Sequence, residues 1–378
     1  MRRRAQLMTR LRLRFVCLLS VAAAAVALAA PFVSDARQPG QKQTRPRQVG
    51  RPAPAQSPAP AGPAAVVADE SVGDDEVVKV DSLEVLLPVT VRDASGALVQ
   101  NLSRTDFRVY EDGTEQPLSE LQARQVPADV ALLIDASSST AESFEDFRRA
   151  ALDFAAQLGE EDRVCLLKFD DRVELLQDWT RSRTQLKRSL GRLAPGMFTR
   201  FNDALYLTAR EQMKPTPQRR RALVILTDGI DSGRGQTAAA ALKALLESQS
   251  AVYVISNTQI ARRRKQAELD TLLNGDASSV NFNSLRIGDL REGLRVLDAS
   301  EQSLALLCAT TGGRLHRPES FDALGDLYRG IAEELRQQYA LYYRPLNKAR
   351  DGSFRRVRVE VKTPGAQVTA RVGYYAPR

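Results

Sequence analysis

Five oxygen-bearing side chains occur where the sequence predicts strands to end or helices to begin. Carboxylates and hydroxyls are hard oxygen donors, which Mg²⁺ and other hard divalent cations bind in preference to nitrogen or sulfur. A site with only one or two carboxylates leaves residual positive charge on the cation and a replaceable water. The carboxylate of another molecule is a natural ligand for that position. The five candidates are Asp135, Ser137, Ser139, Thr199 and Asp228.

Apolar runs alternate with amphipathic segments along the chain, and the strands and helices that this pattern predicts would position these side chains. Short, wholly apolar runs are typical of parallel strands buried on both faces. Residues 144–158 space their apolar side chains three and four apart, which predicts a helix with one buried face. The alternation predicts a doubly wound, mainly parallel α/β sheet with helices on both faces. The expected strands are residues 130–134, 163–169, 173–176, 222–227 and 251–255, and the expected helices include 144–158, 186–193, 237–246, 300–311 and 321–339.

The carboxyl ends of parallel strands meet at one edge of such a sheet, which is where ligands collect. Asp135 directly follows the first expected strand, and Asp228 follows the most apolar one. Thr199 lies in a loop between them, before a helix that begins near Asn202. We therefore expect the five side chains to surround one Mg²⁺, Mn²⁺ or Ca²⁺ ion.

Each part of this pattern also has a simpler interpretation. Asp135 and the serines after it could cap a helix, because Ser and Asp are favoured at that position. Asp228 with Gly229 could form a turn. Only the order of the three parts, and their places at strand ends, favours a cation site. Asp203, near the start of the helix after Thr199, has two open roles: a cap of its helix, or a contact with the ligands of the cation.

The residues for most enzyme chemistries are missing from the sequence. His316 is the single histidine, which argues against His-rich zinc sites and Ser-His-Asp triads, and we expect it to be a surface or packing residue. Residues 233–238 superficially match a dinucleotide fingerprint, but their glycines come several residues after the preceding strand. Neither a Walker A motif nor a Gly-x-Ser-x-Gly elbow occurs. We expect that the protein is not an enzyme.

The distribution of charge argues against nucleic-acid binding. The chain has 378 residues and a formal net charge of +8, with 43% hydrophobic and 26% charged residues, as in a globular protein with a core. Residues 1–51 contain 11 of the 54 basic residues and 1 of the 46 acidic ones. The rest of the chain is close to neutral, so no nucleic-acid partner is expected.

The N-terminus has the pattern of an export signal. Basic residues within 1–14 precede an apolar, alanine-rich run over 15–30, which includes a small-residue cleavage motif at 27–29. This pattern predicts a secretory signal peptide over residues 1–29 and an exported protein, periplasmic or extracellular. An uncleaved membrane anchor is the alternative, and membrane contact is expected only in that case.

Composition also suggests domain boundaries in the remaining chain. Residues 30–76 are rich in Pro and Ala and are expected to be a disordered tether. Residues 77–124 contain β-branched runs bounded by Asp/Gly turns, which predicts a small sandwich-like β module. Residues 128–338 form the expected α/β domain. Residues 339–378 alternate as three antiparallel strands that could complete the β module.

Two further features of the expected α/β domain leave alternatives open. Residues 258–298 interrupt the alternation and contain a run of basic side chains. This run is either a solvated loop or helix face, or else a contact surface for an acidic partner. Cys165 and Cys308 both lie in apolar runs, where a small buried hydrophobe fits. Free, buried thiols are the favoured interpretation, and a disulfide between them is the other.

The candidate ligands together resemble the metal-ion-dependent adhesion site of von Willebrand factor type A domains, over roughly residues 128–340. The resemblance implies that Ser137, Ser139 and Thr199 bind the cation directly, and that Asp135 and Asp228 hold cation-bound waters. Met197-Phe198 stands where the family often has Gly-Gly, and this bulk would narrow the open face of the cation. The matching motifs are Asp135-x-Ser137-x-Ser139, Thr199 before an Asp-Ala-Leu helix start, and Thr227-Asp228-Gly229.

The flanks are similar to those of an exported bacterial subgroup, the "VWFA-related" proteins. The resemblance implies a cation-dependent protein-binding module for adhesion or interaction, which captures an Asp or Glu carboxylate of a protein partner. A metal-independent scaffold of the cell envelope is the first alternative. A metal-assisted hydrolase is the second, and the lack of a nearby general base argues against it. The similar flanking motifs are Val91-x-Asp93-x-x-Gly96, Asp106-Phe107, Glu111-Asp112-Gly113, residues 339–343 and Gly373-Tyr374-Tyr375.

Overall fold

The computed structural model describes residues 47–48, 84–123, 126–137, 144–214, 219–233 and 235–378. The expected signal peptide over 1–29, most of the expected tether and Ser139 lie outside these residues. One short part of the expected tether is described, and it is a strand: β1 (Arg47–Gln48) pairs antiparallel with β8 (Val173–Thr180). The prediction of disorder over 30–76 is therefore wrong for these two residues.

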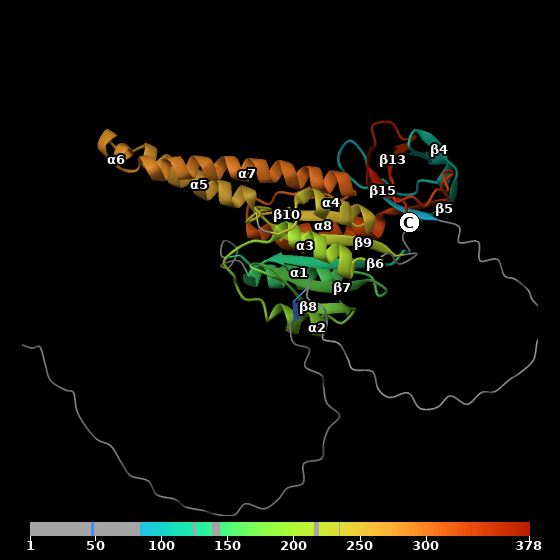
Figure 1. The fold of residues 1–378 in the computed structure, drawn as a ribbon, viewed down its shortest axis with the longest axis horizontal. Helices are drawn as coiled ribbons and strands as arrows, with labels where there is room; N and C mark the ends of the chain where they lie inside the picture. The colour runs from blue at the N-terminus through green and yellow to red at the C-terminus, as the bar shows by residue number, and fades with distance from the viewer. Residues whose placement is uncertain (1–46, 49–83, 124–125, 138–143, 215–218, 234) are drawn as a thin grey trace, which may run out of the picture. The chain divides into compact units, whose positions relative to one another are not determined.

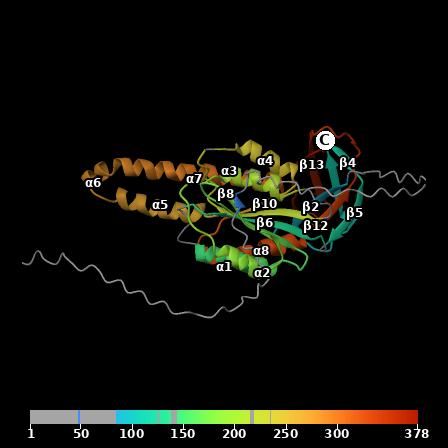
Figure 2. The ribbon, with the colours of Figure 1, turned by 60° about the horizontal axis from the view of Figure 1, so that its bottom comes forward.

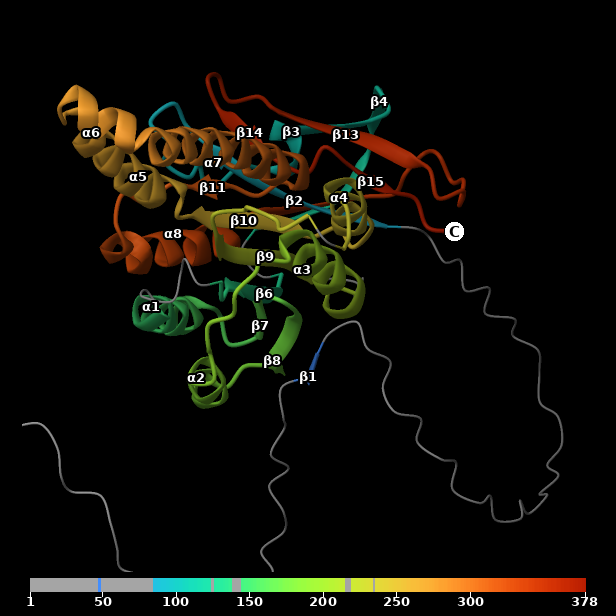
Figure 3. The same ribbon diagram turned by 60° about the vertical axis from the view of Figure 1, so that its left-hand side comes forward.

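A seven-stranded sheet forms the centre of the α/β domain, in the order β1-β8-β7-β6-β9-β10-β11 (Figure 3). Neighbouring strands from β7 to β11 are parallel, and β8 is antiparallel to β7. The predicted mainly parallel α/β sheet is confirmed. The further strands are β6 (Ala128–Asp135), β7 (Arg163–Phe169), β9 (Arg220–Thr227), β10 (Ala251–Ser256) and β11 (Leu315–His316).

Helices cover both faces of this sheet because successive strand side chains point to opposite faces. Val130 and Leu132 of β6 contribute to a core with α1, α2 and α8, whereas Ala131 and Leu133 contribute to a core with α3, α4 and α7 (Figure 2). Cys165 and Cys308 lie in the second core as free, buried thiols. The helices of the two faces are α1 (Phe144–Gln157), α2 (Arg183–Leu190) and α8 (Leu324–Gln337), then α3 (Phe201–Leu207), α4 (Ala238–Glu247) and α7 (Ser284–Thr311).

Helices occupy the segment between β10 and β11 where the sequence pattern is interrupted. Helix α5 (Thr258–Leu273) lies along α7, with α6 (Ala277–Phe282) at their far end (Figure 1). Helix α7 begins at Ser284, well before the expected start at Ser300. The basic run is a helix face: Arg262 pairs with Asp298, and Arg263 pairs with Glu319. No helix within the described residues is long and apolar enough to cross a membrane.

Two four-stranded sheets form a sandwich from both flanks of the α/β domain. Their orders are β14-β2-β12-β5 and β15-β13-β3-β4, and side chains of both sheets share one core, including Leu87, Val109 and Leu341. Of the three strands expected over 339–378, the last is divided: the chain forms β14 and then β15, which belong to different sheets. The strands are β2 (Val85–Arg92), β3 (Phe107–Glu111), β4 (Thr114–Gln116), β5 (Leu118–Ala123), β12 (Tyr339–Tyr343), β13 (Phe354–Val361), β14 (Gln367–Thr369) and β15 (Gly373–Tyr375).

Short helical turns adjoin several of the regular elements. The helix expected over 321–339 is a 3₁₀ turn (Phe321–Ala323) followed by α8, and Tyr339 already belongs to β12. A further 3₁₀ turn (Arg104–Asp106) precedes β3, and a π-helical turn (Thr208–Gln212) extends α3. Helix α8 ends at Gln337 and β12 begins at Tyr339. The last helix of the α/β domain is therefore followed almost directly by the strand with which the chain re-enters the sandwich.

Buried polar groups join the sandwich to the α/β domain. Glu334 of α8 is 1% exposed and accepts hydrogen bonds from Thr90 Oγ1 of β2 (3.3 Å) and from Tyr253 Oη of β10 (3.2 Å). Arg92 of β2 forms an ion pair with the same carboxylate. A buried carboxylate is costly unless it is hydrogen-bonded and paired, so these contacts fix the packing of β2 against α8 and β10.

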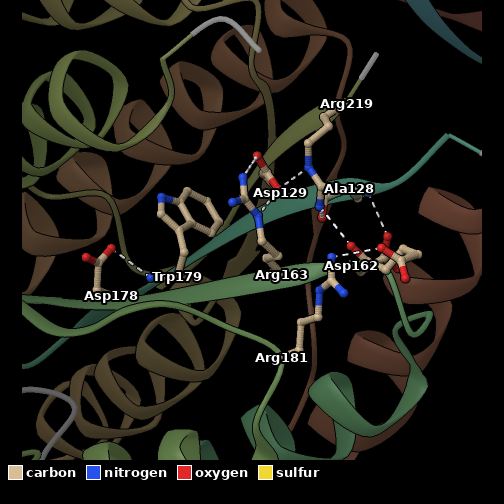
Figure 4. A network of polar contacts seen from close by, with 9 residues as sticks. Ala128, Asp129, Asp162, Arg163, Asp178, Trp179, Arg181 and Arg219 are labelled. Atoms are coloured by element: carbon tan, nitrogen blue, oxygen red, sulfur yellow. Dashed lines mark hydrogen bonds and ion pairs between the residues drawn. The ribbon is translucent and has the colours of Figure 1, made fainter. Parts of the chain in front are cut away.

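An ion-pair network joins the amino ends of the central strands, at the opposite edge from the candidate ligands. The Asp129 carboxylate of β6 accepts hydrogen bonds from Arg163 Nε of β7 (2.9 Å) and from Arg219 Nε, directly before β9 (2.7 Å) (Figure 4). The Asp162 carboxylate accepts a hydrogen bond from the Ala128 backbone N–H (2.6 Å). These contacts hold β6, β7 and β9 in register, so their carboxyl ends also lie side by side.

His316, expected to be a surface or packing residue, lies half-buried on β11, which pairs with β10. Burial, with contributions from Arg314 and Arg92, lowers its pKa from the ordinary 6.5 to about 4. As pH falls below 6.5, the unfolded chain binds a proton that the folded chain does not bind until about pH 4. The stability that neutral His316 contributes is therefore present above pH 6.5 and is lost between pH 6.5 and 4.

We expect the His316→Gln variant to lose this part of the pH dependence. Since one unit of pKa shift corresponds to about 1.4 kcal/mol, the wild type should lose about 1–2 kcal/mol more than the variant between pH 7 and pH 5. Urea unfolding of both proteins at the two pH values measures this difference. An equal loss of stability in both proteins would show that protonation of His316 is not linked to unfolding.

Candidate cation site

The candidate site lies at the carboxyl edge of the sheet, between β6 and β9. Strand β6 has β7 on one side and β9 on the other, and the chain proceeds from β6 to β7 and later from β9 to β10. The connections therefore diverge between β6 and β9, and such a switch point is the usual place for a ligand in doubly wound sheets. Asp135 ends β6 and Asp228 directly follows β9.

Asp135 is fully buried at the end of β6. One carboxylate oxygen accepts a hydrogen bond from the Ser137 backbone N–H (3.0 Å), and the other accepts one from Thr227 Oγ1 (2.7 Å). Burial, with a contribution from the nearby negative charge of Asp228, raises the pKa of Asp135 to about 6, even though Thr227 and Ser137 lower it. The two aspartates are thus close enough to repel each other.

Asp228 is partly buried beside Asp135. A carboxylate oxygen accepts a hydrogen bond from the Ile230 N–H (3.0 Å), and its backbone carbonyl accepts one from Ser300 Oγ of α7. Burial raises the pKa of Asp228, and the positive charge of Lys265 opposes this rise. Among the described residues, none of the ion pairs includes Asp228. The charge of Lys265 therefore offsets only part of the cost of burying this carboxylate.

Backbone hydrogen bonds bring the loop that contains Thr199 to the same edge. The Gly196 N–H donates to the carbonyl of Ala136, directly after Asp135 (2.7 Å), and the Thr199 carbonyl accepts a hydrogen bond from the Ser232 N–H (2.9 Å), after β9. A Cβ at Gly196 would lie 2.5 Å from the Cβ of Asp170, so only glycine allows this close approach. The loop is thus tied to the segments that follow both β6 and β9.

The structure places four of the five predicted ligands at this edge. Asp135 and Ser137 contact each other, and Ser137 is 5% exposed, whereas Thr199 is half-buried in the adjacent loop. Asp228 lies close enough to influence the charge of Asp135. Ser139 is outside the described residues. The convergence of all five side chains on one ion stays a prediction.

Asp203 has a different role from the cap that the sequence suggested. The N-cap of α3 is Arg200, and no side chain caps the helix. The Asp203 carboxylate instead accepts a hydrogen bond from the Gln236 N–H (2.7 Å) and pairs with Arg200. Asp203 therefore holds the segment before α4 against the start of α3.

Thr227 and Ser300 also form hydrogen bonds at this site, although neither is a candidate ligand. Thr227 donates to Asp135 and also accepts the Gly229 N–H (2.9 Å), so it orients both the carboxylate and the turn that follows β9. Ser300 of α7 holds the Asp228 carbonyl. The adjacency of Thr227 to Asp228 in the sequence is the signal that indicates the first of these contacts. Nothing in the sequence indicates Ser300, which is 72 residues from Asp228.

The donor set fits a hard divalent cation with few anionic ligands. Two neighbouring carboxylates, one buried and one partly buried, both have raised pKa values, so a positive charge between them would remove an electrostatic cost. The neighbouring hydroxyls supply neutral oxygens, which Mg²⁺ accepts together with waters. In the part of the chain that the structure describes, no group of three or more His, Cys, Asp or Glu side chains could hold a metal ion. Any cation here would therefore depend on hydroxyls and water as well as on Asp135 and Asp228.

The fold and this edge define a doubly wound α/β domain with oxygen donors at its topological switch point. Residues 130–230 match the family described as the von Willebrand factor type A domain, and the chain therefore contains a domain of this family. The match covers β6 to the turn after β9, which includes every described candidate ligand. No curated protein matches the chain.

Solved structures of low sequence identity resemble this fold. A von Willebrand factor type A protein from Catenulispora acidiphila is 10% identical, with a TM-score of 0.41, and the similarity covers 78% of this chain and 75% of that one. BatB from Bacteroides thetaiotaomicron is 18% identical, with a TM-score of 0.38, over 55% of this chain and 99% of that one. Proximal thread matrix protein 1 from the mussel byssus, described with a zinc-occupied MIDAS motif, is 15% identical, with a TM-score of 0.41. That similarity covers 60% of this chain and about half of the mussel protein (49%).

Proposed function

We propose that this protein is a divalent-cation-dependent protein-binding module, which captures an Asp or Glu carboxylate of a protein partner. In this proposal Ser137 and Thr199 bind the cation directly, together with Ser139, and Asp135 and Asp228 hold cation-bound waters. The cation supplies an open coordination position with residual positive charge, to which a carboxylate of the partner binds. Mg²⁺ is the proposed ion, with Mn²⁺ and Ca²⁺ as substitutes.

The observation that supports this proposal is the pair of neighbouring aspartates at the switch point. Asp135 is fully buried and Asp228 is partly buried, and burial raises the pKa of both carboxyl groups because it disfavours their charged forms. A structural pair of buried carboxylates without a cation would cost stability, whereas a cation between the two loops would offset that cost. The family match over residues 130–230 adds weight, since interaction and adhesion are what such domains suggest.

The proposal also includes where the protein is located and whether it is an enzyme. We infer an exported protein, because residues 1–29 have the composition of a signal peptide. We also infer that the protein binds and does not catalyse. His316, the single histidine, lies on β11, the edge strand of the sheet, whereas the candidate site lies between β6 and β9, and histidine is the commonest general base. A scaffold that binds its partner without metal is the alternative, and in it the sandwich of β2 to β5 and β12 to β15 would make the contacts.

Calorimetry on the full chain tests the proposal. Titration with Mg²⁺ should show one binding site, which Ser137→Ala and Asp228→Asn both remove. A short peptide with aspartate between serines should then bind in Mg²⁺ and lose binding in EDTA, and the same peptide with asparagine should not bind in either. These results follow because a hard cation prefers charged oxygen ligands to amide oxygens.

Asp326→Asn is the matched control for these substitutions. Asp326 lies on α8 with its side chain 81% exposed, so removing its charge should leave Mg²⁺ binding unchanged. If Mg²⁺ binds equally well to the Ser137→Ala and Asp228→Asn proteins, the site assignment is wrong. If a partner protein is captured equally well in Mg²⁺ and in EDTA, the metal-independent scaffold is the better description.

A further inference from the structure

Two large apolar side chains are exposed directly beside the candidate cation site. Met197 is 76% exposed and Phe198 is 56% exposed. Single exposed hydrophobic residues are common and need no explanation. Among the exposed large hydrophobic side chains of the described residues, however, these two are the ones that adjoin each other in sequence. Phe198 also directly precedes Thr199, so its Cα lies about 3.8 Å from that of a proposed cation ligand.

Hydrogen bonds of its backbone hold the loop that contains Met197 and Phe198 in place. The Phe198 N–H donates to the Asp171 carboxylate (3.1 Å), and the Arg200 N–H donates to the Asp170 carbonyl (3.1 Å). The Gly196 hydrogen bond to Ala136 fixes the other end of the loop. A loop anchored on both sides of two exposed apolar side chains loses little conformational freedom on binding, which favours affinity.

Met197 and Phe198 are not part of the domain core. Phe201, three residues after Phe198, turns inward and contacts Phe169, with ring centroids 6.1 Å apart. The core below the loop therefore already contains an aromatic side chain from the first turn of α3. Met197 and Phe198 stay on the solvent side of the loop, next to the edge where the proposed carboxylate of the partner would arrive.

We propose that Met197 and Phe198 select a partner in which the acidic residue adjoins a bulky apolar residue. This inference rests on the proposed function: the cation binds the carboxylate, and the two side chains of this loop cover the apolar neighbour. The occupant is thus an acidic peptide segment with an apolar flank. Burial of apolar surface adds affinity that the cation alone cannot supply, and it distinguishes such a segment from any other exposed aspartate.

Peptide binding in the presence of Mg²⁺ tests this selection. Two peptides are compared by fluorescence anisotropy on the full chain, one with aspartate between leucines and one with aspartate between serines. The wild type should bind the leucine-flanked peptide at least about tenfold more tightly, since one well-covered apolar side chain provides this much. The Met197→Ser/Phe198→Ser double variant should bind both peptides with the weaker affinity and should bind Mg²⁺ as the wild type does.

Phe282→Ser is the matched control, because Phe282 is 90% exposed on α6, which lies at the end of α5 and α7 farthest from the sheet (Figure 1). This variant should keep the preference for the leucine-flanked peptide. Equal affinities of the wild type for both peptides, or an unchanged preference in the double variant, would overturn the selection by Met197 and Phe198. Mg²⁺-dependent binding of both peptides would in that case still support the proposed function. Failure of both peptides to bind in Mg²⁺ would overturn the proposed function and, with it, this inference.

Discussion

Replacing Asp135 with asparagine is expected to abolish the stabilisation that Mg²⁺ gives to the wild-type chain. A cation that binds only the folded state adds about 2.7 kcal/mol to the free energy of unfolding when its concentration is one hundred times its dissociation constant. Asp135 is buried at the end of β6 and close to Asp228, so its charge is central to any attraction for a cation. Urea unfolding in Mg²⁺ and in EDTA measures the difference for both proteins.

The same substitution should have the opposite effect when no cation is present. Asparagine keeps the shape of the side chain and removes a buried negative charge next to Asp228, so the Asp135→Asn protein in EDTA should be at least as stable as the wild type. A variant that is less stable in EDTA and equally stabilised by Mg²⁺ would show that Asp135 serves the fold and not a cation. Asp326→Asn, on the surface of α8, should leave both measurements unchanged.

Replacing Arg355 with methionine is expected to have the largest effect on the stability of the sandwich. Arg355 of β13 is fully buried, and its guanidinium pairs with Glu111 of β3 (3.2 Å). The Glu111 carboxylate also accepts hydrogen bonds from Tyr343 Oη (2.9 Å) and Tyr374 Oη (2.8 Å). Removing the arginine leaves a buried carboxylate without its positive partner, which costs about 3–5 kcal/mol. Chemical unfolding followed by circular dichroism measures the loss.

Arg358 provides the control on the same strand. It pairs with Glu360 at the surface and lies over the ring of Tyr110 at 4.4 Å, with 61% of its own side chain exposed. An exposed ion pair and an exposed cation–π contact are each worth at most about 1 kcal/mol, so Arg358→Met should cost much less than Arg355→Met. Similar losses in the two variants would mean that burial of the Arg355–Glu111 pair is not what stabilises the sandwich.

The sequence predicts the central strands well because their signal is local. Strands β6 and β9 extend the apolar runs at 130–134 and 222–227 by no more than a few residues, and the alternation with helices correctly indicates a parallel sheet. The first half of α7 differs from the expected interruption, although its buried side chains Ile287, Leu290 and Leu297 have helical spacing. Ile287 and Leu290 form a separate small core with Leu269 of α5, and the spacing within α7 does not reveal that α5 is the helix that covers it.

In the C-terminal strands and in the candidate site, too, local sequence signals are predictable and contacts between distant elements are not. The alternation at 368–372 resembles one strand, but Arg371 is buried and donates to the Leu86 carbonyl, and the chain changes sheets there. Asp135 and Asp228 could be placed because strand ends are visible in the sequence. The Ser300 contact to Asp228, and the Asp203 contact to Gln236, come from elements that meet only in the folded chain.

The pairing of β2 has a consequence for how this chain is made. Both neighbours of β2 in its sheet, β12 and β14, are C-terminal to the whole α/β domain. Thr90 and its hydrogen-bond partner Gln338 are 248 residues apart, which a ribosome covers in roughly 10–50 s. Throughout that time the nascent β2 exposes the edges and apolar side chains of an unpaired strand, which invite aggregation. Newly made chains should therefore depend on a chaperone until the last strands emerge.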